Sequence, residues 1–355
     1  MSGRLDQLES LRGFAALYVM LHHISSNYLH LQQTVWGAPF RFGQEAVLVF
    51  FLLSGFVICY SWERNAGRSD FAVFMIKRAR RIYPIFILAL LIGWLVQCHA
   101  AGAWLAPDLR NLAGNLFMLQ DLPKRPGGIC EPFAQNMPLW SISFEWWFYM
   151  MFYPLHRWVR RDHQKLVVFA LCGLGLIGNL VAPNTGWWFL TFFLIWWAGV
   201  ELAREFMATG TVTVRRQRGM LAMLAVPTIW FAVLTWQQHR RGEPITFFSY
   251  PFSEFRLFLM SLVFLAMMFA WRRLKLVGFD SLFGPFRFLA PVSFGIYLIH
   301  YPLICHWSLL GDPSHRVLDL VIRVGVVFVL AWVLEGPVQN WVNRLSNRWL
   351  AKLNH

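Results

Sequence analysis

The first apolar segment carries an arginine and two adjacent histidines, residue types that are rare inside a membrane-spanning helix. Arg12 and His23 lie eleven positions apart, about three full turns of an α-helix, so their side chains point to nearly the same face. The helical rise separates them by about 16 Å along the axis. His22 is rotated by about 100° from that stripe. Because ionisable groups are costly in hydrocarbon, the stripe predicts a polar centre that faces protein or a wet cavity.

A carboxylate and a further histidine occur in later apolar segments. Glu145 lies about two turns inside the fourth such segment, with Ser141 one turn before it on the same face. Ser293, Tyr297 and His300 are spaced four and three apart and therefore share one stripe of another helix. A carboxylate at such a depth is either paired for structural reasons or functional, and the sequence leaves both interpretations open.

Basic residues precede the third apolar segment in the run KRARRIYP, residues 77–84. Arg78 and Arg81 are three apart and share a face, where their guanidinium groups could bind phosphate oxygens. The pattern alone favours the alternative, an anchor attracted to anionic lipid at the membrane boundary.

Two further motifs have a structural interpretation. Ser54 and Gly55, in the run FFLLSGF, are small residues that favour the close approach of another helix. Glu335 lies near the inner end of the last apolar segment and is expected to pair with Arg12 or Arg81.

This set of residues suits acid/base chemistry on a hydroxyl group. A histidine titrates near neutral pH and can act as a base, a carboxylate can orient it, and arginines can hold a phosphate or an oxyanion. The sequence contains no P-loop, Rossmann fingerprint, HExxH or GxSxG motif. Nucleotide hydrolysis and hydride transfer are therefore unsupported.

The composition is that of a multi-pass membrane protein. Of the 355 residues, 57% are hydrophobic and only 14% are charged, whereas a soluble protein carries about 25% charged residues. Apolar segments long enough to span a bilayer are predicted at 11–29, 43–62, 75–97, 138–156, 166–183, 187–203, 219–237, 255–271, 290–310 and 317–341. We predict an all-α fold, a polytopic transmembrane bundle of about ten helices. Residues 1–345 form a single transmembrane domain, and residues 346–355 a short cytoplasmic tail.

Lysines and arginines concentrate in alternate connecting segments, which predicts that both termini lie in the cytoplasm. Arg240 and Arg241 fall in a predicted outer segment and depart from this rule. The net charge of +14 is explained by membrane topology, so no nucleic-acid partner is expected. The one long outer segment, about 98–137, contains a predicted interfacial helix over 109–119. It is long enough to fold over an opening, although a plain connector fits equally.

The five cysteines are scattered without paired spacing. Neither a zinc site nor a redox motif is predicted, and no metal ligands are expected. Cys98 and Cys130 both fall on the predicted outer side, so a disulfide between them stays open.

Six motifs, in this order and spacing, resemble those of a known family. The stretches are LDQLESLRGFAALYVMLHH, FFLLSGF, KRARRIYP, PLWSISFEWWFY, SFGIYLIHYP and LEGP, from Leu5 to Pro337. They resemble the integral-membrane acyltransferase 3 family of bacterial surface-polysaccharide O-acyltransferases. The resemblance implies a multi-pass protein of the bacterial inner (cytoplasmic) membrane that moves an acyl group, usually acetyl, from cytoplasmic acyl-CoA to a glycan hydroxyl on the periplasmic side.

The same resemblance implies the partners. Acetyl-CoA or another acyl-CoA would be the co-substrate, with no permanently bound cofactor. A glycan or lipid-linked sugar would be the acceptor, in contact with membrane lipid and with polysaccharide-assembly proteins.

The resemblance also implies roles for individual residues. The family's arginine and histidine pattern falls on Arg12 and His23, and its basic pair falls on Arg78 and Arg81. His23 would be the general base or a transient acyl acceptor, and Glu145 would tune it or position the sugar. The three arginines would bind the donor phosphates or charge. Supporting positions are His22, Ser141, Ser293, Tyr297 and His300.

Two alternatives stay open on the same residues. A proton-coupled transporter of a glycan or small solute could use Glu145 and His300 as its titrating groups. A structural partner of a polysaccharide-assembly complex would need the polar residues only to pack helices.

Overall fold

Long helices form at every position where the sequence predicts an apolar span. The computed structural model describes residues 2–65, 70–310 and 313–353. The long helices in this part of the chain are α1 (Ser2–His23), α2 (Gly43–Arg64), α3 (Phe71–Ala101), α5 (Trp140–Trp158), α6 (Arg161–Val181), α7 (Thr185–Thr209), α8 (Val214–Arg240), α9 (Phe252–Arg273), α11 (Ser293–Tyr301) and α12 (Arg316–Val333). Shorter or peripheral helices are α4 (Leu109–Leu116), α10 (Phe279–Leu282) and α13 (Gln339–Leu353). The described residues contain no strand beyond one isolated bridge, so the all-α prediction is confirmed.

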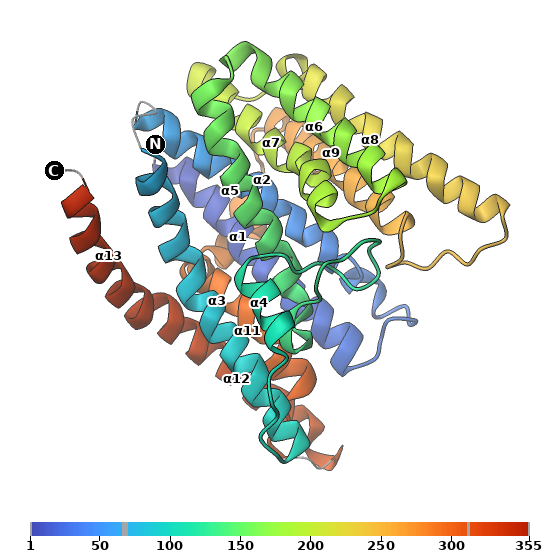
Figure 1. Cartoon of the computed structure of the whole chain (residues 1–355), viewed down its shortest axis with the longest axis vertical. Helices are drawn as coiled ribbons and strands as arrows, with labels where there is room; N and C mark the ends of the chain where they lie inside the picture. The colour runs from blue at the N-terminus through green and yellow to red at the C-terminus, as the bar shows by residue number, and fades with distance from the viewer. Residues whose placement is uncertain (1, 66–69, 311–312, 354–355) are drawn as a thin grey trace.

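Eight helical stretches in the described residues are long and apolar enough to cross a membrane. The helices α1 and α5 are not among them. Both helices are covered by others: α1 packs against α2 and α11, and α5 against α2, α3 and α7. The chain is therefore a multi-pass membrane protein in which α1 and α5 pack among other long helices (Figure 1).

The helices α2 and α7 cross with their backbones in close contact. A Cβ atom added at Gly55 would lie 2.1 Å from the Trp196 carbonyl oxygen, and one at Gly199 would lie 2.1 Å from the Leu52 carbonyl oxygen. The two backbones therefore touch at reciprocal glycines. This contact confirms that the FFLLSGF run serves close packing.

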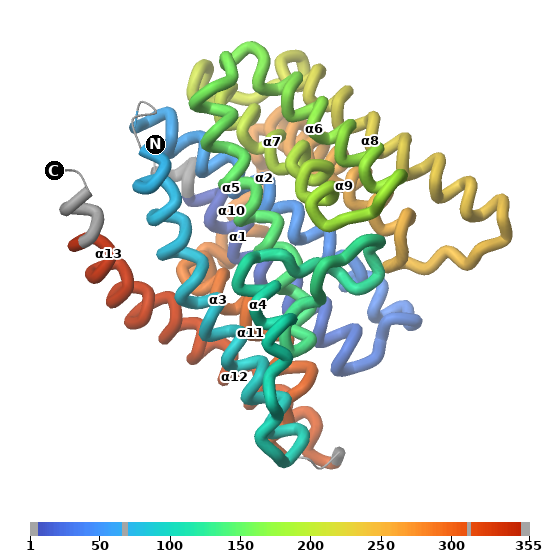
Figure 2. Tube along the Cα trace, viewed as in Figure 1, coloured from blue at the N-terminus to red at the C-terminus, as the bar shows by residue number. Residues whose placement is uncertain are grey.

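The C-terminal part of the chain follows one side of the bundle. After α12, a π-helical segment over Leu334–Val338 leads into α13, which runs beside the start of α3 (Figures 1 and 2). Arg80 on α3 donates a hydrogen bond of 2.7 Å to Asn347. The predicted tail from residue 346 is thus mostly helix up to Leu353, and its last two residues lie outside the described part.

The long segment between α3 and α5 is anchored in the bundle. Arg125 is only 4% exposed and donates hydrogen bonds to Asp121 at 2.5 Å and to Glu254 at 3.1 Å. Its guanidinium group also packs over the rings of Trp140, Phe144, Trp188 and Phe192. The segment is therefore more than a plain connector. The predicted interfacial helix forms as α4, and Cys98 and Cys130 are both free thiols.

The reciprocal glycine contact generates a stability prediction. Gly199→Ala should destabilise the bundle by about 1–3 kcal/mol, because the added methyl group must push the α2 backbone away. Thermal unfolding of the detergent-purified protein measures this loss. Gly173→Ala on α6 is the matched control, since a Cβ there meets nothing within 4 Å. Equal melting temperatures for the two variants would contradict the prediction.

Candidate active site

Three histidines meet where α1 and α11 end. The His23 ring lies 5.3 Å from the His300 ring and 4.7 Å from the rings of His22 and Tyr301, measured between centroids. His300 is fully buried, His22 is 6% exposed, and His23 is only partly buried. His23 is therefore the most exposed of the three histidines.

Hydrogen bonds on the Nδ1 atoms orient these imidazoles. His22 Nδ1 lies 2.6 Å from the Phe40 carbonyl oxygen and His300 Nδ1 lies 2.9 Å from the Ile296 carbonyl oxygen. A carbonyl oxygen can only accept, so both Nδ1 atoms carry the proton and both Nε2 atoms hold a lone pair. His23 Nδ1 lies 3.4 Å from Asn27 Oδ1. If the amide oxygen accepts there, Nε2 of His23 is also the basic atom.

Two π-helical turns build this end of the site. The α-helix α1 ends at His23 and continues as a π-helix over Ile24–Tyr28, and α11 continues as a π-helix over Pro302–His306. These two turns contact each other. Such turns are rare and occur frequently at functional sites. The α1 helix also begins at Ser2 instead of near residue 11, so Arg12 lies in its middle and His23 at its end.

Glu145 belongs to a separate polar group on α2 and α5. Its Oε1 atom accepts hydrogen bonds from Ser54 at 2.8 Å and from Tyr149, and these two hydroxyls lie 3.1 Å apart. The charge of Glu145 also acts on Arg12. Among the described residues, Glu145 makes no hydrogen bond to His23. The hydrogen-bond partners of this carboxylate are therefore Ser54 and Tyr149, and the His23 imidazole is not one of them.

The three predicted arginines differ in their partners. Arg81 forms an ion pair with Glu335, whose other oxygen accepts a 3.0 Å hydrogen bond from the Gly295 amide. This pairing confirms one of the two partners expected for Glu335. Arg78 instead packs over the Phe74 ring at 4.6 Å. Arg81 thus turns toward Glu335, whereas Arg78 packs over a ring of its own helix, so the two guanidinium groups have different neighbours.

Arg12 and Arg78 have no counter-ion bonded to them. Neither guanidinium forms a hydrogen bond or an ion pair with a described residue, and Arg78 Nε is buried without a partner. Both side chains are only partly exposed. The charged groups near Arg12 are Arg81, Glu335 and Glu145, and the Tyr149 ring lies 6.0 Å from Arg78. Two half-buried arginines without a bonded counter-ion are suited to binding an anion.

Tyr297 connects the two ends of the site. Its hydroxyl is 2.7 Å from Ser141 Oγ, and its ring lies 6.2 Å from the His300 ring. The charge of Glu145 acts on this tyrosine as well. Ser293, in contrast, donates its hydroxyl to the Ala290 carbonyl oxygen at 2.8 Å, which is a local helix-start contact away from the histidines.

The sequence interpretation missed four polar residues of the site. They are Asn27 beside His23, Tyr301 beside His300, and the pair Ser54 and Tyr149 on Glu145. Helical spacing could have found two of them, because Asn27 follows His23 by four positions and Tyr149 follows Glu145 by four. The sequence predicts only a packing role for Ser54, and no spacing pattern links it to Glu145, which lies on another helix.

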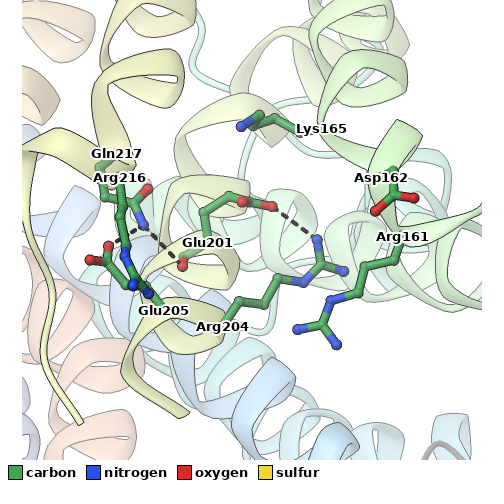
Figure 3. Close-up of a pocket in the computed structure, with 8 residues that line it drawn as sticks. All are labelled: Arg161, Asp162, Lys165, Glu201, Arg204, Glu205, Arg216 and Gln217. Atoms are coloured by element: carbon green, nitrogen blue, oxygen red, sulfur yellow. Dashed lines mark hydrogen bonds and ion pairs between the residues drawn. The ribbon is translucent and has the colours of Figure 1, made fainter. Parts of the chain in front are cut away.

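The molecule also has a polar hollow outside this site. It encloses about 300 Å³ between the start of α6, the end of α7 and the start of α8. Charged side chains line it, including Arg161, Lys165, Arg204 and Glu201 (Figure 3). None of the predicted site residues borders it.

Comparisons with known proteins identify a family. Residues 5–336 match the family profile described as Acyltransferase domain. The chain is 33% identical over 176 residues to Acyltransferase MdmB of Streptomyces mycarofaciens, which covers 48% of this chain and 44% of that protein. It is 34% identical over 149 residues to Exopolysaccharide production protein ExoZ of Rhizobium meliloti, covering 41% and 44%.

A third relative aligns along almost the whole chain. Peptidoglycan O-acetyltransferase OatA of Listeria monocytogenes is 22% identical over 412 aligned residues, covering 98% of this chain and 60% of that protein. The chain spans about half the length of the curated relatives that it matches. No solved structure gives a significant match.

The ion pair between α3 and the α12–α13 junction generates a prediction. Glu335→Gln should lower stability by about 1–3 kcal/mol, because Arg81 loses its counter-charge but stays partly solvated. The thermal midpoint in detergent measures the change. Asp162→Asn, which breaks an exposed pair with Arg160 at 3.7 Å, is the control and should leave the midpoint within experimental error.

Proposed function

The chain belongs to the acyltransferase family whose profile it matches, and on this premise we propose that it is a membrane O-acyltransferase. It moves an acyl group, acetyl in the simplest case, from cytoplasmic acyl-CoA to a hydroxyl of a surface or exported glycan on the far side of the inner membrane. Relatives named for peptidoglycan and exopolysaccharide support a glycan acceptor. The concentration of basic residues at one end of the bundle supports cytoplasmic termini.

One observation carries the proposal. The helix α1 presents an uncommitted cation, Arg12, and a basic imidazole, His23, about three turns apart on one stripe. Arg78 on α3 is a second cation without a bonded counter-ion. An anionic donor and a hydroxyl acceptor that approach from opposite ends of this stripe could meet inside the bundle.

The arginine end would hold the donor. Arg12 and Arg78 supply unpaired guanidinium groups for the phosphates of acyl-CoA, and Arg81 borders the same end while it stays tied to Glu335. Glu145 contributes through Arg12, whose charge it partly balances. We therefore assign Glu145, held by Ser54 and Tyr149, to positioning at the donor end, because its contacts do not reach His23.

The histidine end would activate the acceptor. His23 Nε2 accepts the proton of the sugar hydroxyl, and the hydroxyl oxygen attacks the acyl carbonyl carbon. The carbon–sulfur bond of the thioester breaks, and the departing thiolate takes a proton from the imidazolium. In an alternative route, the lone pair of His23 Nε2 first takes the acyl group from the thioester and then gives it to the sugar hydroxyl. The same atom therefore serves direct transfer and transfer through an acyl-enzyme.

His23 is the first test of the mechanism. His23→Ala should lower glycan acylation by about 10²–10⁴-fold, the range that a lost general base costs, while the protein still inserts and folds. Mass spectrometry of the acceptor glycan from cells that express each variant measures the acyl groups. His163→Ala, an exposed histidine on α6, is the control. Wild-type acylation in the His23 variant would overturn the assignment, and unchanged glycan in cells without the protein would overturn the function.

Arg78 tests the donor end. Arg78→Ala should weaken acyl-CoA binding by roughly 10–100-fold, the equivalent of one or two hydrogen bonds to a charged group. Isothermal titration of the purified protein with acetyl-CoA gives the Kd. Arg157→Ala, which removes an exposed arginine at the same end of the bundle, should leave the Kd unchanged. Equal affinities for the two variants would remove Arg78 from the donor site.

A further inference from the structure

A cysteine, a glutamate and a histidine converge where α2 and α5 end, outside the proposed acyl-transfer site. Cys59 and Glu63 lie one turn apart on α2 and His156 lies on α5. One ligand atom from each lies within 4.8 Å of the other two. We propose that Cys59, Glu63 and His156 bind one Zn²⁺ ion. Thiolate, imidazole and carboxylate are the three ligand types that zinc takes in proteins.

The imidazole of His156 is already oriented for this role. Its Nδ1 atom lies 3.1 Å from the Phe152 carbonyl oxygen, which can only accept, so Nδ1 carries the proton. The lone pair is therefore on Nε2, where Arg204 Nη2 donates at 3.1 Å. A histidine that gives one N–H to a backbone carbonyl and offers the other nitrogen is the usual arrangement of a metal ligand.

Two ligand atoms of the cluster already face cations. Arg204 contacts His156, and Arg161 Nη1 lies 3.4 Å from Glu63 Oε1. A zinc ion would displace both contacts. Arg204 would keep its hydrogen bonds to Gln164 and, at 2.9 Å, to Glu201. Arg161 is 58% exposed and can turn into water.

The cluster has an entry path and room for a fourth ligand. The Glu63 side chain is 29% exposed. The hollow of about 300 Å³ lies alongside, because Arg161 and Arg204 line it and also contact Glu63 and His156 (Figure 3). A water molecule from this hollow would complete the tetrahedral coordination that zinc prefers.

The charges of the proposed site balance. On binding, the Cys59 thiol releases its proton to solvent, so one thiolate and one carboxylate offset the two positive charges of the ion. Tetrahedral ligands of zinc lie about 3.3–3.8 Å apart, given bonds of about 2.0–2.3 Å. The observed spacing needs only side-chain adjustments to reach this geometry. The ion would then join α2 to α5 at the end of the bundle opposite to the histidine cluster.

Cobalt provides a direct test. The full-length protein, purified in detergent with a histidine-free tag and stripped with a chelator, is titrated with Co²⁺. We expect a sulfur-to-cobalt charge-transfer band and tetrahedral d–d bands that saturate at one equivalent and disappear when Zn²⁺ is added. Cys59→Ser should abolish the charge-transfer band. Glu63→Gln and His156→Gln should each weaken zinc binding at least about tenfold, the lower bound for lost outer-shell contacts.

Cys172→Ser is the matched control, because Cys172 is also buried but lies on α6 outside the cluster. It should keep the cobalt spectrum and the zinc affinity of the wild type. An absent charge-transfer band in the wild type overturns the proposal, as does a band that persists in Cys59→Ser. Loss of the band in Cys172→Ser as well, in protein that still elutes as a single species, also overturns it.

Discussion

A charged side chain inside an apolar bundle is tolerated only with a partner or an opening, and this constraint organises the whole molecule. Most of the inward-facing arginines obey it through ion pairs with carboxylates on the same or another helix: Arg81 with Glu335, Arg125 with Asp121 and Glu254, Arg204 with Glu201, Arg256 with Glu45, and Arg323 with Asp319. Among the described residues, Arg12 and Arg78 have no such carboxylate partner, and their guanidinium groups make no hydrogen bond. Their missing partners are the best structural argument for an anionic substrate.

The same constraint explains which helices carry the site. The long helices α1 and α5 are not among the stretches that are long and apolar enough to cross a membrane, and both pack against other long helices. Reciprocal glycines bring α2 against α7, while Ser54, next to Gly55 on α2, donates its hydroxyl to Glu145. Close packing and the polar site thus depend on neighbouring residues of one motif.

The proposed site has an arginine end and a histidine end, and the carboxylate of Glu145 is assigned to the arginine end instead of to His23. Glu145 is bound by two hydroxyls and acts on Arg12, whereas His23 has an amide, Asn27, beside its Nδ1 atom. An amide can hold an imidazole in one tautomer without adding a charge, so the proposed base needs no buried carboxylate next to it. Tyr297, between Ser141 and His300, is the structural link between the ends.

The sequence by itself determined the all-α fold, the positions of the long helices and the shared stripe of Arg12 and His23, because hydrophobicity and helical periodicity act locally along the chain. It also proposed Arg81 as one partner of Glu335. Only the tertiary structure decided that Arg78 and Arg81 diverge, that Ser293 bonds locally, and that Glu145 lies apart from His23. It alone brought His156 to Cys59 and Glu63. Contacts between helices depend on crossing angles and helix rotation, which are set by packing across the whole bundle. They therefore produce no periodic pattern in the sequence of any single helix.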